Sequence, residues 1–135
     1  MKDFQQEQLF TELTPEQASV IEGGGVVTVK SIECVTAGAD WPSSVNDDDT
    51  YIQISDQTIW GPNSMDDGLS ANVSTSKAFK GSTKISVYDN DPVSSDFIGS
   101  IDVSGPTRDK KGKPAYITKS VEGSGSKYNV TFKVT

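Results

Sequence analysis

Short stretches in which apolar and polar residues alternate recur along most of this 135-residue chain. The clearest is the last, where Tyr128, Val130, Phe132 and Val134 are separated by single polar residues. Successive side chains of a β-strand point to opposite sides, so this period of two predicts a strand with one buried face. A chain built from such segments must bury their apolar faces against one another.

About eight such segments lie between Val26 and Thr135, and Gly, Pro, Asn and Asp residues separate them. We therefore predict an all-β fold, an antiparallel eight-stranded β-sandwich over residues 25–135. In the first segment the alternation changes phase near Lys30-Ser31, which predicts a β-bulge. Ile59-Trp60 is predicted to be a short strand that ends at Gly61-Pro62. Another strand is predicted to repeat Phe97, Gly99, Ile101 and Val103 on one face.

The composition excludes several classes of function. The chain has no histidine, and 12 Lys and Arg against 19 Asp and Glu give a net charge of −7. It therefore lacks the commonest general base and the usual zinc ligand, and its charge disfavours nucleic-acid binding. The single cysteine, Cys34, cannot form an intrachain disulfide and is expected to be a small buried residue. No apolar run is long enough for a transmembrane segment.

Three aspartates, Asp89, Asp91 and Asp96, lie in one short loop between two expected strands. Asp89 and Asp91 are two apart and so point the same way at a strand end, and the following turn can return Asp96 toward them. Calcium takes six to eight oxygen ligands from flexible loops, which makes this loop a candidate calcium site. An acidic hairpin turn is the alternative. A pair of catalytic carboxylates is a further alternative. However, a small sandwich has few residues with which to enclose a substrate cleft, and this chain has no histidine, so we do not expect an enzyme.

A second acidic segment contains Asp40 and the run Asn46-Asp47-Asp48-Asp49, just before the strand expected at Tyr51. A solvated loop is the alternative interpretation of such a run. If this loop and the Asp89–Asp96 loop meet at one end of the sandwich, their carboxylates could form one site. Asp66-Asp67-Gly68 is a third candidate, although an Asp-Gly turn explains it as well.

Two of these segments resemble C2 domains. Asp49-Thr50-Tyr51-Ile52 is similar to the Asp-Pro-Tyr-Val that opens their second strand, with Thr50 in place of the usual proline. Ile85-Ser86-Val87-Tyr88-Asp89-Asn90-Asp91, followed by Asp96-Phe97-Ile98-Gly99, is similar to their third calcium loop. This loop is one residue shorter than is common, which could remove a coordination position.

The resemblance covers roughly Val26 to Thr135 and implies a calcium-binding module that docks on an anionic surface, either a phospholipid or a polysaccharide. An exported structural or interaction protein without calcium-dependent activity is the alternative. The ligands that the resemblance implies are Asp40, Asp49, Asp89, Asp91 and Asp96. It also implies surface docking through apolar residues at the loop tips, namely Trp41, Val45 and Val93, although Trp41 could equally pack on the sandwich rim.

The first 24 residues differ in composition from the rest, being rich in Gln and Glu and helical in pattern. Leu13 and Ile21 precede Gly23-Gly24 at the spacings of bacterial double-glycine leader peptides, which the segment resembles. The resemblance implies cleavage after Gly24 by the peptidase of an ABC exporter, and hence a secreted protein. The alternatives are a capping helix packed on the sandwich and a cytoplasmic protein.

A basic loop spans Thr107–Pro114 and carries Arg108, Lys110, Lys111 and Lys113. It could contact phosphate. A solvated turn is the alternative, because Asp109, Gly112 and Pro114 are typical turn residues.

Overall fold

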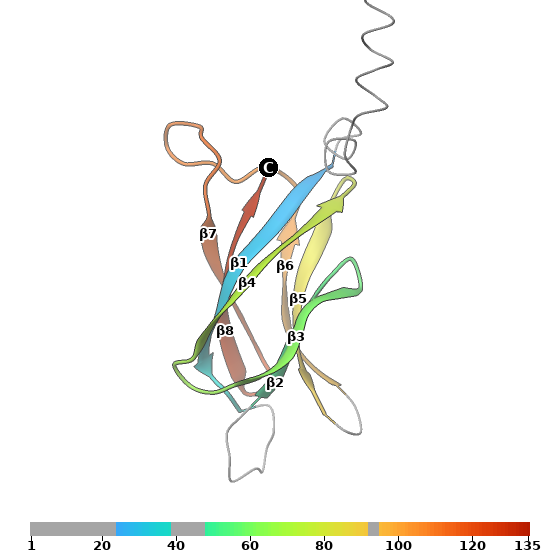
Figure 1. The fold of residues 1–135 in the computed structure, drawn as a ribbon, viewed down its shortest axis with the longest axis vertical. Helices are drawn as coiled ribbons and strands as arrows, with labels where there is room; N and C mark the ends of the chain where they lie inside the picture. The colour runs from blue at the N-terminus through green and yellow to red at the C-terminus, as the bar shows by residue number, and fades with distance from the viewer. Residues whose placement is uncertain (1–23, 39–47, 92–94) are drawn as a thin grey trace, which may run out of the picture.

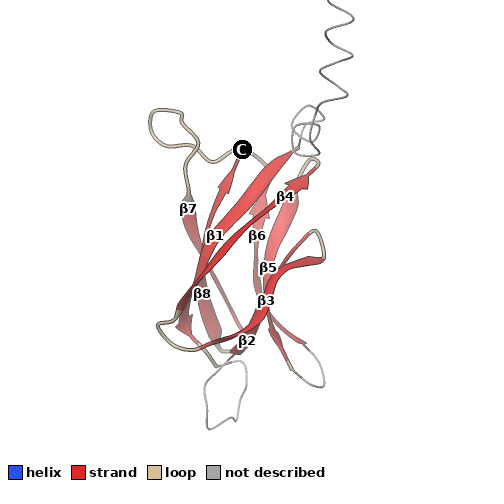
Figure 2. Ribbon diagram, viewed as in Figure 1, coloured by secondary structure: helices blue, strands red, loops and turns tan. Residues whose placement is uncertain are grey.

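The computed structural model describes residues 24–38, 48–91 and 95–135, and these form a sandwich of two β-sheets (Figures 1 and 2). All strand pairs are antiparallel. The strands are β1 Gly25–Thr36, β2 Asp48–Ile54, β3 Gln57–Met65, β4 Ser70–Phe79, β5 Thr83–Asn90, β6 Ser95–Val103, β7 Ile117–Gly123 and β8 Ser126–Val134. The predicted eight-stranded antiparallel sandwich is confirmed. The helical segment expected over residues 1–24 lies, except for Gly24, outside the described residues.

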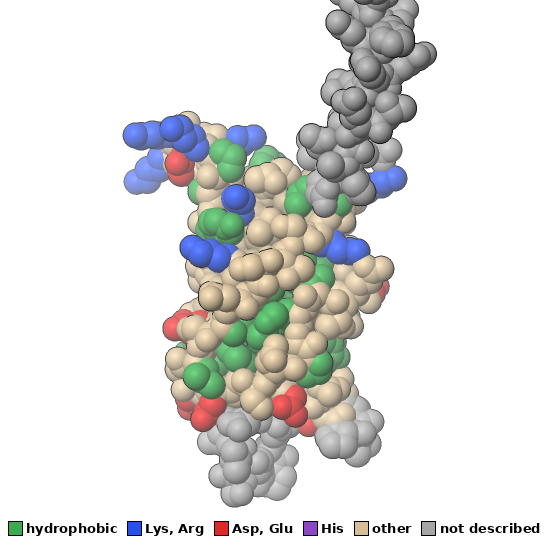
Figure 3. Space-filling view, in the orientation of Figure 1, with side chains coloured by type: hydrophobic (Ala, Val, Ile, Leu, Met, Phe, Trp, Pro, Cys, Tyr) green, Lys and Arg blue, Asp and Glu red, His purple; other side chains and the backbone are tan. Residues whose placement is uncertain are grey.

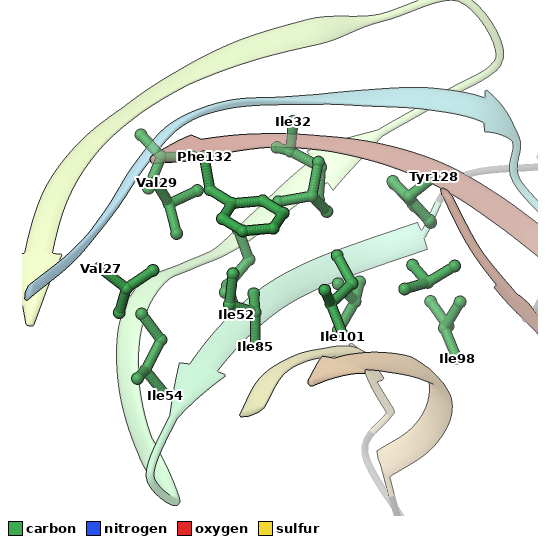
Figure 4. Close-up of a cluster of buried hydrophobic side chains, with 14 of the residues drawn as sticks. Val27, Val29, Ile32, Ile52, Ile54, Ile85, Ile98, Ile101, Tyr128 and Phe132 are labelled. Carbon is green, nitrogen blue, oxygen red and sulfur yellow. The ribbon is translucent and has the colours of Figure 1, made fainter. Parts of the chain in front are cut away.

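One sheet has the strand order β4-β1-β8-β7 and the other has the order β3-β2-β5-β6. Alternate residues of β2, β5 and β8 face the space between the sheets, as the period of two predicted. Along β8 every second residue from Ser126 to Val134 is buried. Figure 4 shows how side chains from both sheets interdigitate in this core, among them Val29, Ile52 and Phe132. Burying these apolar side chains is the main source of the fold's stability.

The phase change in β1 is the predicted β-bulge. Its register with both neighbouring strands shifts between Val29 and Ser31. The prediction for β3 was wrong, because this strand does not end at Gly61-Pro62 but continues to Met65. It is an edge strand, and its register shift places Gly61 and Pro62 opposite Tyr51, so the missing N–H of proline breaks no central ladder.

The predicted common face of Phe97, Gly99, Ile101 and Val103 is interrupted in β6. Val87 pairs with Gly99 but Tyr88 pairs with Phe97, so β6 has one extra residue, Ile98, at this point. This bulge turns Phe97 outward, where it is 51% exposed, and leaves Ile98 buried. Upstream of the bulge the inward positions are therefore the even-numbered ones.

Strand direction divides the connections between two ends of the sandwich. The β1–β2, β3–β4, β5–β6 and β7–β8 connections share one end, and the other three connections share the opposite end. In the orientation of Figure 3, Asp and Glu side chains gather at the lower end and Lys and Arg at the upper end. We call these the acidic end and the basic end. No helix among the described residues is long and apolar enough to span a membrane.

Candidate metal centre

The strands β5 and β6 carry three aspartates to the acidic end. Asp89 continues the buried face of β5 after Ile85 and Val87, and its own side chain is fully buried. Asp96 pairs with Asp89 across the ladder, and both lie on the inward side of their strands. Asp91 lies two residues beyond Asp89, as the sequence pattern required, and the structure brings all three carboxylates together.

One carboxylate oxygen from each of Asp89, Asp91 and Asp96 lies within 4.8 Å of the others. We call these three residues the carboxylate group. Asp91 and Asp96 are partly exposed. Partial desolvation, a hydrogen bond in which protonated Asp96 donates to Asp91, and the negative charge of Asp91 raise the pKa of Asp96 above its ordinary value of 3.8. Close like charges therefore oppose full ionisation here, which is the electrostatic condition that a bound cation relieves.

Asp49 reaches this group through its main chain. Its N–H donates a hydrogen bond of 2.7 Å to Oδ1 of Asp89, across the β2–β5 pair in which Thr50 is the register partner of Asp89. The Asp49 carboxylate is exposed and accepts a hydrogen bond of 3.4 Å from the Ser64 hydroxyl of β3. It is not part of the carboxylate group, so its role as a metal ligand stays a prediction.

The bulge in β6 turns Asp96 toward the inward side of the strand, and two glycines, Gly99 and Gly123, make room for that bulge. Gly99 and Gly123 lie where β6 and β7 approach each other between the two sheets. A Cβ on Gly123 would lie 2.2 Å from the main-chain oxygen of Ile98, and one on Gly99 would lie 2.9 Å from Cβ of Val121. Both distances are far below ordinary contact, so side chains here would displace the bulge. The inward direction of Asp96 therefore depends on β7 as well as on its own loop.

A second buried carboxylate at this end has a different environment, and sequence reasoning missed its role. Asp48 is fully buried, and its Oδ2 accepts hydrogen bonds of 2.7 Å from the hydroxyls of Ser126 and Tyr128. The Tyr128 hydroxyl also lies 2.7 Å from Oγ1 of Thr50, and the Ser126 hydroxyl accepts the N–H of Gly38 at 3.0 Å. We call these residues the Asp48 network. It fastens both described ends of the β1–β2 connection to β8.

Cys34 lies beside this network, and Tyr128 and Asp48 are among the groups that influence its thiol. Cys34 is fully buried, as its position in an expected strand predicted. Desolvation, as the largest cause, raises the pKa of this thiol to about 11. Desolvation raises the pKa of Tyr128 as well. Neither the thiol of Cys34 nor the hydroxyl of Tyr128 is ionised near neutral pH.

The β3–β4 connection is hydrogen-bonded to the end of β1 and to the residue that follows it. Oδ1 of Asp67 accepts the N–H of Ala37 at 2.7 Å, and the main chains of Cys34 and Leu69 are joined by a hydrogen bond of 2.7 Å. Oδ1 of Asp66 accepts the N–H of Asp67 at 2.7 Å. These contacts are those of a turn, and neither aspartate belongs to the carboxylate group.

Several predicted residues lie outside the part of the chain that the structure describes. They are the ligand Asp40, the docking residues Trp41, Val45 and Val93, and the leader residue Gly23. Gly24 is described, and a Cβ at this position would lie 1.8 Å from the main-chain oxygen of Phe79. Leader cleavage at Gly24 stays a prediction.

An aromatic row lies on the outer face of the sheet beside the carboxylate group. The rings of Tyr51 and Tyr88 stack with their centroids 5.0 Å apart, and Phe97 follows at 5.4 Å from Tyr88. Because Phe97 neighbours Asp96 in the chain and is half exposed, an apolar surface adjoins the three carboxylates. The bulge in β6 produces this arrangement, since it turns Asp96 inward and Phe97 outward.

Comparison with known proteins shows the fold of the chain. No protein-family model and no curated protein sequence matches it. Among solved structures, a C2 domain aligns with a TM-score of 0.51 at 8% identity, covering 82% of this chain and 98% of that one. A C2 domain of plant extended synaptotagmin 1 aligns with a TM-score of 0.50 at 15% identity, over 84% and 95% of the two chains.

A calcium-bound structure of two C2 domains of extended synaptotagmin 2 is also similar. Its TM-score is 0.51 at 16% identity, and the alignment covers 84% of this chain and 45% of that chain. Identities this low establish architecture and leave the chemistry to be argued from the residues themselves. The described part of this chain has a C2-like fold.

Proposed function

We propose that this protein is a calcium-binding C2-like module whose acidic end docks on an anionic phospholipid surface when calcium is bound. The observation that carries the proposal is the convergence of Asp89, Asp91 and Asp96 within 4.8 Å. Calcium–oxygen bonds are about 2.3–2.6 Å long, so two ligands on opposite sides of one ion are roughly 4.6–5.2 Å apart. The spacing of the three carboxylates therefore fits one shared calcium ion.

The chemistry of the donors also supports calcium. All three are carboxylates, which suit hard cations, and the chain has no histidine to favour a transition metal. Asp89, Asp91 and Asp96 would hold the ion, with Asp40 and Asp49 as further ligands that the C2 resemblance implies. The buried Asp89 is fixed by the N–H of Asp49, so the two strands β2 and β5 preorganise the deepest ligand.

Docking would follow from the change in charge. A divalent cation at the carboxylate group makes the acidic end less negative, which lowers its repulsion from phosphate headgroups. The half-exposed Phe97 supplies an apolar side chain beside the site, and Trp41, Val45 and Val93 are the loop residues proposed to join it. Under this proposal the protein is not an enzyme, and it is exported with the help of its leader-like segment.

Isothermal titration of calcium into the full chain tests the proposal. We expect saturable binding that Asp91→Asn with Asp96→Asn weakens at least about tenfold, because two of the three charged ligands are lost. The matched control is Asp56→Asn with Asp102→Asn, which removes the same charge from exposed positions at the basic end. Magnesium at the same concentration controls for non-specific screening.

Unchanged calcium affinity in the Asp91/Asp96 double variant would contradict the assignment of the site. Absence of any binding at millimolar calcium would favour the alternative, an exported interaction protein without calcium-dependent activity. Co-sedimentation with phosphatidylserine vesicles then tests docking, because its calcium-dependent fraction should disappear in the double variant and persist in the control.

A further inference from the structure

The basic end carries a concentration of positive charge that the proposed calcium site does not use. The protein is acidic overall, yet Lys and Arg side chains gather at this end (Figure 3). Four cations lie in the β6–β7 loop, and Lys30 of β1 and Lys133 of β8 lie over the ring of Tyr116, which follows that loop. Only one acidic residue, Asp109, lies within this loop. We define the basic surface by Tyr116 and the six cations Lys30, Arg108, Lys110, Lys111, Lys113 and Lys133.

The centre of this surface is a tyrosine between two ammonium groups. Nζ of Lys30 lies 5.1 Å, and Nζ of Lys133 4.8 Å, from the ring centroid of Tyr116. The two ammonium groups therefore lie within about 10 Å of each other and contact the same ring. Tyr116 is itself 42% exposed. Lysines around a half-exposed aromatic ring are typical of segments that lie at a membrane–water interface.

The adjoining loop is held in shape by its own hydrogen bonds. Oδ1 of Asp109 accepts the N–H groups of Lys111 and Lys113 at 2.8 and 3.0 Å. Arg108 donates to the main-chain oxygen of Gly112 at 2.8 Å, and Thr107 bonds the main chain of Val134 at the base. The loop's one carboxylate is thus occupied by main-chain donors. None of the six cations forms an ion pair with a carboxylate in residues 24–38, 48–91 or 95–135.

We propose that the basic surface binds anionic phospholipid membranes without calcium, as a second contact opposite the carboxylate group. The loop between β6 and β7 projects from the body of the sandwich (Figure 1), and Lys and Arg side chains cover this protruding part of the molecule in the space-filling view (Figure 3). Such a surface suits a planar array of phosphates, whereas a small anion needs donors that converge. The exposed ring of Tyr116 favours a bilayer, which offers an apolar layer beneath its headgroups.

The two contacts face in opposite directions. β8 has nine residues and runs between the two ends, so they are separated by roughly 30 Å. One molecule could therefore hold two membranes, the first through the basic surface and the second through the acidic end once calcium is bound. This bridging step rests on the proposed function, whereas binding through the basic surface does not.

Flotation of the full chain with vesicles in chelator tests the second contact. We expect binding to phosphatidylcholine–phosphatidylserine vesicles, weakening as salt rises, and none to phosphatidylcholine alone. Replacing Lys110, Lys111 and Lys113 with Gln should weaken binding on the order of a hundredfold, because each lysine near an anionic surface contributes roughly a fivefold factor. The control is Lys77, Lys84 and Lys127 changed to Gln, which removes the same charge from positions outside the basic surface. It should bind like the parent protein.

Asp91→Asn with Asp96→Asn should leave binding in chelator intact but abolish calcium-dependent vesicle clustering, so failures of the two proposals are distinguishable. Equal loss in the control variant, or no binding in chelator, would overturn the inference. Binding to heparin or duplex DNA as tight as binding to the vesicles at equal salt would also overturn it, since the surface would then recognise polyanions in general.

Discussion

Two buried aspartates at the same end of the sandwich have opposite surroundings. Asp48 and Asp89 are both fully buried and both lie near the end of an inner strand. Asp48 accepts hydrogen bonds from two hydroxyls and Asp89 accepts the N–H of Asp49, but Asp89 also shares its space with the carboxylates of Asp91 and Asp96. Neutral donors satisfy a buried charge and stabilise the fold, but crowded like charges create a demand for a cation. Under the proposed function, this difference separates a structural acid from a cation-binding acid.

The same substitution at both positions should therefore have different effects on stability without calcium. Asp48→Asn removes the charge that two hydroxyls bond and should lower the free energy of unfolding by about 1.5–3 kcal/mol. Asp89→Asn removes a repulsive charge and should leave the stability unchanged or raised by up to about 1 kcal/mol. Urea unfolding in chelator measures both values. Equal destabilisation by the two variants would remove the distinction between the acids.

Tyr128→Phe tests whether the Asp48 network stabilises the fold without affecting calcium binding. The variant keeps the buried ring but removes the hydroxyl that bonds both Asp48 and Thr50. We expect a loss of about 1–3 kcal/mol of stability, because the buried Asp48 carboxylate loses a donor and the buried Thr50 hydroxyl loses its acceptor. The calcium affinity should change much less than the stability, which calorimetric titration of the folded variant would show. A large loss of affinity would mean that the Asp48 network also shapes the metal centre.

Gly123→Ala tests whether the bulge in β6 positions Asp96 in the carboxylate group. The new methyl group would meet the main-chain oxygen of Ile98, so the β6 bulge must shift and Asp96 with it. We expect weaker calcium binding together with about 1–3 kcal/mol of destabilisation from overpacking. Gly105→Ala is the matched control, because no atom lies within 4 Å of the added Cβ there. Normal calcium affinity in Gly123→Ala would show that the bulge does not position Asp96.

The raised pKa of Asp96 predicts how pH affects the carboxylate group. At a pH below the unfolded-state pKa, Asp96 is protonated in both the folded and the unfolded chain, and its contribution to calcium-free stability is fully present. That contribution is lost as the pH rises through the raised pKa of the folded state. Calcium competes with the same proton, so its affinity should rise over that window. Titrations at a series of pH values from about 4 to about 7 should therefore show tighter binding as the pH rises. Asp96→Asn should flatten this dependence.

The smallest expected effect is on the reactivity of Cys34, which lies beside the Asp48 network. Burial raises its pKa to about 11, so the native thiol should react very slowly with a thiol reagent at neutral pH. Reaction should become rapid in denaturant. Fast labelling of the native protein would show that the region around the Asp48 network opens readily.

Local pattern predicted much of the architecture, and long-range contacts explain what it missed. The period of two located the strands, and the spacing of Asp89, Asp91 and Asp96 predicted that they meet. The bulge at Ile98 could not be read from β6, because it depends on the close approach of Gly123 from β7. The role of Asp48 was also hidden, since its partners Ser126 and Tyr128 lie 78 and 80 residues away.

Thermal unfolding of the wild type and Asp89→Asn, each in calcium and in chelator, tests the central claim most directly. Binding at a hundredfold excess over the dissociation constant stabilises a folded domain by about 2.7 kcal/mol, which raises the melting temperature by about 10 °C in a domain of this size. We predict that rise in the wild type and its loss in Asp89→Asn. Asp48→Asn should start lower but keep the rise. An equal calcium-induced rise in wild type and Asp89→Asn would contradict the assignment of Asp89, Asp91 and Asp96 as the calcium site.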